Sequence, residues 1–302
     1  MEITKDSKEL AKVWEKLVNP QTIYDECEFR LAFFDSQKEE IMGVVDSLSQ
    51  PNVLLPLQKN IATEKVTFIS TPFMERNQGF CTEGNENKLL DIYTQVASNY
   101  EQYRLDDIAV SDPVTQTDRC IEDENYYVYD ALKVGLNNLS ELPSKMPKRR
   151  LGRQLETALG YLESKVNIKS ASLGETFLVI KNITKDRFGS DSWLEDDHIQ
   201  SGALSLTNLP TKNKLEVYSY ILEMNDKQIG GHIGVSYNDV YYALFSGAHY
   251  LDELTELPKL VHILNFKALL DAGLTNLDTG LGDCGWKENW GFESVAQYKF
   301  LN

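Results

Sequence analysis

Three segments near the C-terminus constrain the fold more than any other part of the chain. Leu215–Glu223 alternates apolar and polar residues, a period that predicts a β-strand, and Ile229–Tyr237 and Val240–Ser246 follow as further strands. Their connections are short: Asn225–Gln228 has the composition of a turn, and Asn238-Asp239 is typical of a two-residue hairpin. Consecutive strands joined by so few residues pair antiparallel, so we expect an antiparallel sheet here.

A helix and two short strands complete this region. Apolar residues recur at helical spacing between Leu257 and Ala268, with Pro258 in the first turn and Gly273 as the C-terminal stop. Asn276–Thr279 and Ser294–Phe300 are predicted as the remaining strands. Antiparallel strands followed by a helix and further strands indicate an α+β unit.

The first half of the chain repeats this rhythm of strands and helices. Helical spacing of apolar residues predicts helices at Glu9–Leu17, Tyr24–Phe34 and Lys88–Tyr100. The predicted strands are Ile41–Val45, Asn52–Gln58, Val66–Ser70 and, at the end of this half, Tyr126–Tyr129. The similarity between the halves predicts two comparable lobes.

A basic segment with two prolines marks the expected boundary between the lobes. It carries five cations, Lys145, Lys148, Arg149, Arg150 and Arg153. A clean apolar stripe begins at Leu151 and predicts a helix with Arg149 and Arg153 on its opposite face. Phe177–Arg187 is expected to form another helix. We therefore place the domains at residues 1–145 and 146–302.

The charge balance excludes some functions. The chain of 302 residues has 30 Lys and Arg against 46 Asp and Glu, a net charge of −16, which disfavours a general nucleic-acid binder. The apolar runs are too short to span a bilayer, and the N-terminus lacks the pattern of a secretion signal, so we expect a cytoplasmic protein with no membrane partner. Cys27, Cys81, Cys120 and Cys284 are scattered, and no cluster of His, Cys and Asp has metal-ligand spacing.

Three stretches resemble the GNAT-like acyl-CoA N-acyltransferase superfamily, and in particular its double-lobed Fem-like branch. The first is Tyr242–Ala248, a strand that runs into small residues, and the second is the helix closed by Gly273 with the following Asn276–Gly280. The third is Gly285–Phe292, which is similar to the family's Lys-x-x-aromatic-Gly-Phe ending. The resemblance implies an α+β fold of two GNAT-like lobes, built from mixed, mainly antiparallel sheets with helices, in which the C-terminal lobe is catalytic.

The same resemblance implies an N-acyltransferase that uses direct attack by a primary amine on a thioester or ester donor. It implies no tightly bound cofactor, with acyl-CoA as co-substrate and a small-molecule or amine-bearing acceptor. The family's Gln/Arg-x-x-Gly-x-Gly/Ala pyrophosphate loop is replaced here by Ser246, Gly247 and Ala248. Those three residues, with Arg149 and Arg153, are the expected donor-binding residues. Some Fem-like members use aminoacyl-tRNA instead, so tRNA is the one nucleic acid that we keep as a possible donor.

Three residues are candidates for catalysis. Lys287, among aromatic residues, is placed to stabilise an oxyanion or bind an anionic group; the alternative is a surface lysine lying over packed tryptophans. Asp278, at a strand end, and His249, after the small-residue segment, are candidates to accept the amine proton. Turn chemistry accounts equally well for an aspartate beside Gly280 and Gly282.

Two other functions remain open. One is a tRNA-dependent aminoacyltransferase whose basic segment, residues 145–153, binds nucleic acid. The other is a non-catalytic binding protein on an acyltransferase scaffold. The sequence contains no Gly-x-x-x-x-Gly-Lys and no Gly-x-Ser-x-Gly, so nucleotide hydrolase and serine hydrolase functions lose their main support.

Overall fold

The computed structural model describes residues 1–71, 73–283 and 285–301, and Cys284 lies outside them. Two compact units emerge, each built around its own sheet. The first comprises residues 1–125, 210–212 and 296–302, and the second comprises residues 126–209 and 213–295. The units first separate between Asn125 and Tyr126, whereas the sequence placed the boundary after residue 145.

The first unit contains a mixed sheet with the strand order β1-β2-β3-β4-β6-β15-β7, and β5 pairs with β3. Its strands are β1 Glu2–Thr4, β2 Glu39–Val45, β3 Val53–Asn60, β4 Val66–Phe68, β5 Phe80–Cys81, β6 Tyr103–Ala109, β7 Cys120–Glu122 and β15 Gln297–Phe300. Its helices are α1 Ser7–Leu17, α2 Cys27–Ala32 and α3 Glu86–Asn99. The helix predicted at Tyr24–Phe34 is shorter, because a 3-10 turn at Ile23–Asp25 precedes α2.

The second unit carries the region with the strongest sequence signal. Its strands are β8 Tyr126–Asp130, β9 Asn167–Ser170, β10 Leu215–Met224, β11 Lys227–Tyr237, β12 Val240–Ala248, β13 Asn276–Leu281 and β14 Glu293–Val295, in the order β14-β8-β13-β12-β11-β10-β9. Its helices are α4 Ala131–Val134, α5 Leu142–Lys145, α6 Arg149–Ser164, α7 Leu173–Phe188, α8 Asp197–Ser205 and α9 Leu257–Asp271. The mixed sheets and their helices confirm the predicted α+β class.

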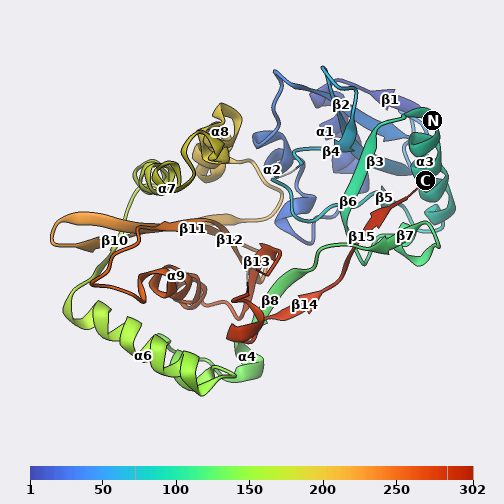
Figure 1. Ribbon diagram of the computed structural model, residues 1–302. Helices are drawn as coiled ribbons and strands as arrows, with labels where there is room; N and C mark the ends of the chain where they lie inside the picture. Colours follow the sequence, from blue (N-terminus) through green and yellow to red (C-terminus); the bar gives the residue numbers. More distant parts are fainter. Residues whose placement is uncertain (72, 284, 302) are drawn as a thin grey trace. The chain divides into compact units, whose positions relative to one another are not determined.

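Local sequence explains the limits of these elements. Asn225 and Asp226 both have positive φ angles, as a tight hairpin between β10 and β11 requires. The Ser172 side chain accepts a hydrogen bond from the Glu175 backbone and caps α7, and Gly273, at φ +68°, ends α9. Figure 1 shows α7 and α8 on one face of the sheet and α9 and α6 on the other.

Two strands pair differently from the sequence expectation. Tyr126–Tyr129, predicted to end the first half, forms β8 and pairs with β13 and β14 in the second sheet. The single strand predicted at Ser294–Phe300 is divided: β14 stays in the second sheet, and β15 pairs with β6 and β7 in the first. The buried Gln297 side chain donates hydrogen bonds to the carbonyls of Glu75 and Asp107, which holds β15 in the first sheet.

Within the described residues, no helix is both long enough and apolar enough to span a bilayer.

Candidate functional site

The parallel strands β12 and β13 are paired along only part of their length. Their register joins Val240 to Asn276, Tyr241 to Leu277 and Tyr242 to Asp278. Beyond Tyr242, residues 243–248 continue beside β11, but no strand of the described chain pairs with their other edge. This edge therefore presents backbone N–H and C=O groups that the sheet does not use.

β13 contains an irregular turn just after the residues that pair with β12. The pairing with β8 shifts between Asp278 and Leu281, and Gly280 has φ +71°, a conformation that favours glycine. The Asp278 side chain, which is 3% exposed, accepts a hydrogen bond of 2.8 Å from the Gly280 backbone. Asp278 therefore stabilises the turn that leaves the edge of β12 open.

Lys287 stabilises the same turn from the other side. Its ammonium donates hydrogen bonds of 2.8, 2.8 and 2.7 Å to the carbonyls of Thr279, Gly280 and Leu281. The ammonium also lies 5.2 Å from the centre of the Tyr127 ring, and the residue is only 5% exposed. The structure thus brings Asp278 and Lys287 together around one backbone turn, and Lys287 is buried rather than lying on the surface.

The next carboxylate, Asp283, organises the segment that carries Lys287. It accepts hydrogen bonds from the backbone N–H groups of Trp286, Lys287 and Glu288. Burial raises the pKa of the Asp283 carboxyl, but these backbone donors outweigh that effect and leave the pKa below its ordinary value. Its contacts are those of a turn-forming aspartate.

The small residues at the end of β12 are part of the strand. The sequence ended this strand at Ser246, whereas the structure continues it through Gly247 and Ala248, which pair with Gly231 and Gly230 of β11. A Cβ at Gly247 would lie in ordinary van der Waals contact, at 3.5 Å, with the Ile180 and Ile183 side chains, so this end of the strand packs against α7. His249 is half-buried just after the strand, and its backbone N–H donates to Ile229.

A hollow of about 260 Å³ lies along the open edge of β12. It is lined by Leu244, Phe245, Ser246, Gly247 and Ala248 of that strand. Because neighbouring side chains of a strand point to opposite faces, five consecutive lining residues place the hollow at the edge of the strand rather than on one face. The opposite wall consists of Ile183, Thr184, Arg187, Phe188, Trp193 and Leu194.

The opposite wall is held in place by packing and charge. Trp193 stacks on Phe245 with ring centres 5.9 Å apart, and Phe177 meets the same ring edge-on at 5.6 Å. The Glu195 carboxylate lies 3.1 Å from the Lys185 ammonium and 3.9 Å from that of Lys181, both on α7. These contacts fasten the short 3-10 turn Trp193–Glu195 to α7 and so fix the tryptophan beside the hollow.

Sequence reasoning did not single out Trp193 or Arg187. The signal that could have identified Trp193 is its position inside the acidic stretch Asp191–Asp197. A segment that is simply solvated does not require a large aromatic side chain. In the structure Trp193 is 48% exposed and Phe188 is 52% exposed, so their aromatic surfaces remain accessible.

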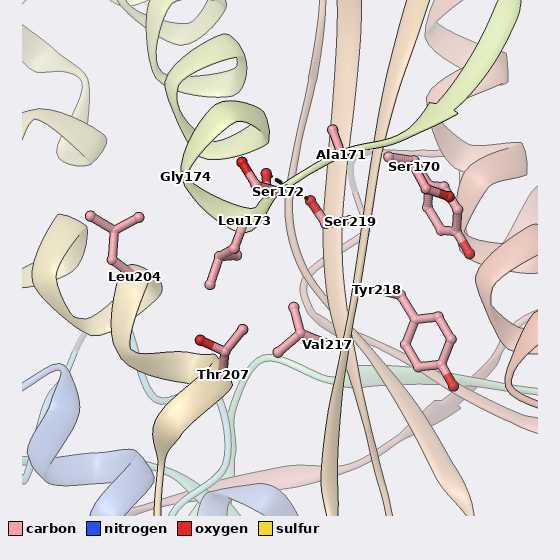
Figure 2. Close-up of a pocket in the computed structure, with 11 residues that line it drawn as sticks. Ser170, Ala171, Ser172, Leu173, Gly174, Leu204, Thr207, Val217, Tyr218 and Ser219 are labelled. Carbon is pink, nitrogen blue, oxygen red and sulfur yellow. Dashed lines mark hydrogen bonds between the residues drawn. The ribbon is translucent and has the colours of Figure 1, made fainter.

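A second hollow, of about 590 Å³, lies where α7 begins. Figure 2 shows Leu173, Leu204, Thr207 and Val217 around it, beside β10. Several of its hydroxyl groups already donate to neighbouring side chains: Ser219 to Thr176 at 2.7 Å, Tyr218 to Glu216 at 3.2 Å and Tyr220 to Asp271 at 2.6 Å. The lining residues include no charged side chain, so the chemistry favours the smaller hollow beside β12.

One histidine lies in β11 and another, half-buried, lies in α9. His232 is fully buried, and its Nε2 lies 2.6 Å from the Tyr241 hydroxyl. Burial, reinforced by His262, lowers the pKa of His232 to about 3, and burial with the nearby Lys259 and Lys287 lowers that of His262 to about 4. Both imidazoles are therefore neutral at physiological pH and occupy structural positions.

The predicted donor-binding arginines lie at the start of α6. Arg149 and Arg153 are exposed, and no carboxylate of the described chain pairs with either. The adjacent Gln154 side chain donates to Glu256, the residue at the N-cap of α9, at 3.5 Å. The start of α6 thus lies close to the start of α9. Among the described residues, no group of three His, Cys, Asp or Glu side chains is arranged to hold a metal ion.

Comparisons with known proteins agree with this geometry. Residues 149–288 match the family model described as an acetyltransferase (GNAT) domain. A search of curated protein sequences gives no significant match.

Three solved structures are similar to the chain over nearly its whole length. The C-terminal domain of an Agrobacterium fabrum protein, provisionally named a lysylphosphatidylglycerol synthetase, has a TM-score of 0.61 at 9% identity, covering 98% of this chain and 93% of that one. FemX has a TM-score of 0.56 at 12% identity, covering 100% and 98%. A tandem GNAT protein from the clavulanic acid biosynthesis pathway has a TM-score of 0.57 at 9% identity, covering 97% and 93%. The chain therefore has the double-lobed GNAT-like fold, and its residues 149–288 match the model of an acetyltransferase (GNAT) domain.

Proposed function

We propose that this protein is an N-acyltransferase that moves an acyl or aminoacyl group from a thioester or ester donor to a primary amine. The observation that carries the proposal is the open edge of β12 beside a hollow of about 260 Å³. An extended donor binds such an edge through backbone hydrogen bonds, and the same N–H groups, near Phe245 and Ser246, polarise the reacting carbonyl.

The reaction needs little from side chains. The neutral amine attacks the carbonyl carbon, a C–N bond forms, and the negative charge on the oxygen is stabilised by backbone N–H groups. The C–S or C–O bond to the donor then breaks, and the amine proton passes to the departing group. His249, half-buried at the end of β12, is the group that we propose as its carrier.

Asp278 and Lys287 act in this proposal as positioning residues. Three carbonyl groups accept the hydrogen bonds of the Lys287 ammonium, and the Asp278 carboxylate accepts one from Gly280. Both hold the turn of β13 that keeps the edge of β12 open. Their effect on the reaction is therefore exerted through the backbone.

We propose acyl-CoA as the donor, with Arg149 and Arg153 contacting its phosphates. The N-cap of α9 is Glu256, whose carboxylate pairs with the Lys259 ammonium. The charge of Lys259 is therefore already neutralised and is not free to bind a pyrophosphate. The unpaired arginines at the start of α6 lie close by, because Gln154 contacts Glu256. Arginine supplies paired donors that suit phosphate oxygens.

A thermal-shift screen with acetyl-CoA, longer acyl-CoAs and tRNA tests the donor class. Stabilisation by an acyl-CoA supports the proposal. Stabilisation by tRNA alone would instead favour an aminoacyl-tRNA donor, a reading supported by the exposed cations of residues 145–153 in an otherwise acidic chain. Stabilisation by none of them would favour a non-catalytic protein.

A matched pair of variants tests the location of the site. Leu244→Trp fills the hollow beside β12, and Leu204→Trp fills the hollow beside β10. We expect Leu244→Trp to abolish the release of free thiol in a transfer assay, while Leu204→Trp retains it. Circular dichroism establishes that each variant is folded. Equal loss in the two variants would contradict the assignment of the site to β12.

A further inference from the structure

The hollow beside β12 has a chemistry that specifies what it binds. Of its described lining residues, Arg187 alone carries an ionisable side chain. The guanidinium lies 5.1 Å from the centre of the Phe188 ring, and no carboxylate of the described chain pairs with it. A cation that stacks on an aromatic ring, without a carboxylate partner, is available to a ligand anion.

The rest of the wall is apolar or weakly polar. The Trp193 and Phe188 rings are about half exposed, and Leu244 and Phe245 lie across from them. Exposed aromatic surface beside a single cation suits a molecule with one anionic group and one apolar group. The hydroxyls of Thr184 and Ser246 add neutral hydrogen-bonding groups.

The volume limits the size of the ligand. Pockets for drug-sized ligands measure roughly 300–1,000 Å³, and this hollow has about 260 Å³. A nucleotide donor, with its several phosphates, requires more space and more cations than a single arginine supplies. The hollow therefore fits a molecule of amino-acid size and not the phosphate portion of the donor.

The absence of a carboxylate from the described lining also matters for the chemistry. A carboxylate beside the incoming amine would raise the amine's pKa and keep it protonated, and a protonated amine cannot attack a carbonyl. In the described lining the one charge is that of Arg187, which attracts the opposite end of the molecule, so the wall does not raise the pKa of the amine and favours its neutral, attacking form.

We propose that the acceptor is a free α-amino acid with an apolar or aromatic side chain, whose carboxylate binds Arg187 and whose side chain packs on Trp193. The need for an amine rests on the proposed acyl transfer, whereas the carboxylate and the apolar group rest on the hollow itself. The sequence supports the same orientation: Arg187 lies in the last turn of α7, where the helix dipole favours a cation and holds it in place.

Calorimetric titration tests the binding step without a donor. The probes are L-phenylalanine, L-leucine and L-tryptophan, each compared with its carboxamide, in which the carboxylate is replaced by a neutral group. We expect the wild-type protein to prefer at least one acid over its amide. Arg187→Gln should weaken binding of the acid by about 10- to 100-fold, the usual value of a charged hydrogen bond, and leave binding of the amide unchanged.

Arg119→Gln is the control, because Arg119 is an exposed arginine of the other unit and is not a lining residue of the hollow. It should retain the wild-type preference for the acid. A wild-type protein that binds acid and amide equally, binds neither in all three pairs, or keeps its preference in the Arg187→Gln variant overturns the inference.

A transfer assay with acetyl-CoA separates this inference from the proposed function. If thiol release is observed but acids and amides are equally good acceptors, the acceptor inference is wrong and acyl transfer stands. If no acyl-CoA supports transfer while the Arg187-dependent preference for acids persists in titration, acyl transfer is wrong and the hollow remains an amino-acid site.

Discussion

Replacing Lys287 with methionine distinguishes a structural role from a chemical one. Methionine keeps much of the volume but removes three hydrogen bonds of 2.7–2.8 Å to the carbonyls of Thr279, Gly280 and Leu281. Each charge-assisted hydrogen bond contributes about 1.5–3 kcal/mol, and part of their sum is offset because the cost of burying the ammonium disappears as well. We therefore expect Lys287→Met to lower the free energy of unfolding by about 3–5 kcal/mol.

Thermal unfolding followed by circular dichroism measures this effect. A loss of this size corresponds to a fall of roughly 6–20 °C in the unfolding midpoint. Lys133→Met is the control: Lys133 is an exposed lysine of the same unit that pairs with Glu293, and its replacement should leave the midpoint unchanged.

Two outcomes for Lys287→Met would contradict its positioning role. If Lys287→Met melts at the wild-type temperature but no longer supports acyl transfer, the ammonium acts on the substrate and not on the turn of β13. If both stability and transfer are unchanged, the turn does not depend on the lysine, and the positioning role is wrong.

Three further predictions concern buried groups. Gly234→Ala should destabilise the protein by about 2–4 kcal/mol, because the new Cβ would lie 2.6 Å from a backbone oxygen and closer still to the Tyr241 phenol. Denaturant unfolding measures the change in stability, and an unchanged midpoint would contradict the prediction. As the pH falls from 6.5 to 5, the unfolded chain binds protons that the folded imidazoles of His232 and His262 do not, because their pKa values are lowered in the folded protein. The free energy of unfolding should therefore fall by up to about 1.4 kcal/mol per pH unit for each histidine. His232→Gln should reduce this slope, and an unchanged slope would show that His232 is not its cause. Burial, followed by the charge of its neighbours, raises the pKa of the Cys27 thiol to about 12. A thiol reagent at pH 8 should therefore label Cys27 only after the protein unfolds. Rapid labelling of Cys27 in the native protein, detected by peptide mass spectrometry, would show that the thiol is not buried.

Many of the elements could be predicted from sequence because their signals are local. The strands of the β10–β11–β12 meander follow from alternation and turn residues, and α9 follows from helical spacing, an early proline and a terminal glycine. What the sequence did not predict was pairing over long distances. Alternation predicts that residues 126–130 and 297–300 are strands, but it contains no information on which sheet each one joins.

The residues of the candidate site also fall into those that the sequence indicated and those that only the structure revealed. The sequence directed attention to Lys287 because of its aromatic neighbours and the family resemblance, and to Asp278 because it lies at the end of a predicted strand. Only the folded chain showed that both side chains bond to the same turn of β13. Arg187 and Trp193 were not singled out at all, because they come from segments far from β12 in sequence.

By itself, then, the sequence determined the α+β class and the presence of two lobes, since both depend on short-range patterns of polarity and turn formation. The tertiary structure decided that β12 and β13 pair only as far as Tyr242 and Asp278, and that α7 and the turn at Trp193 close the far side of the hollow. These features depend on the pairing of β12 with β13 and on the stacking of Trp193 on Phe245, and such contacts form only when distant parts of the chain pack together.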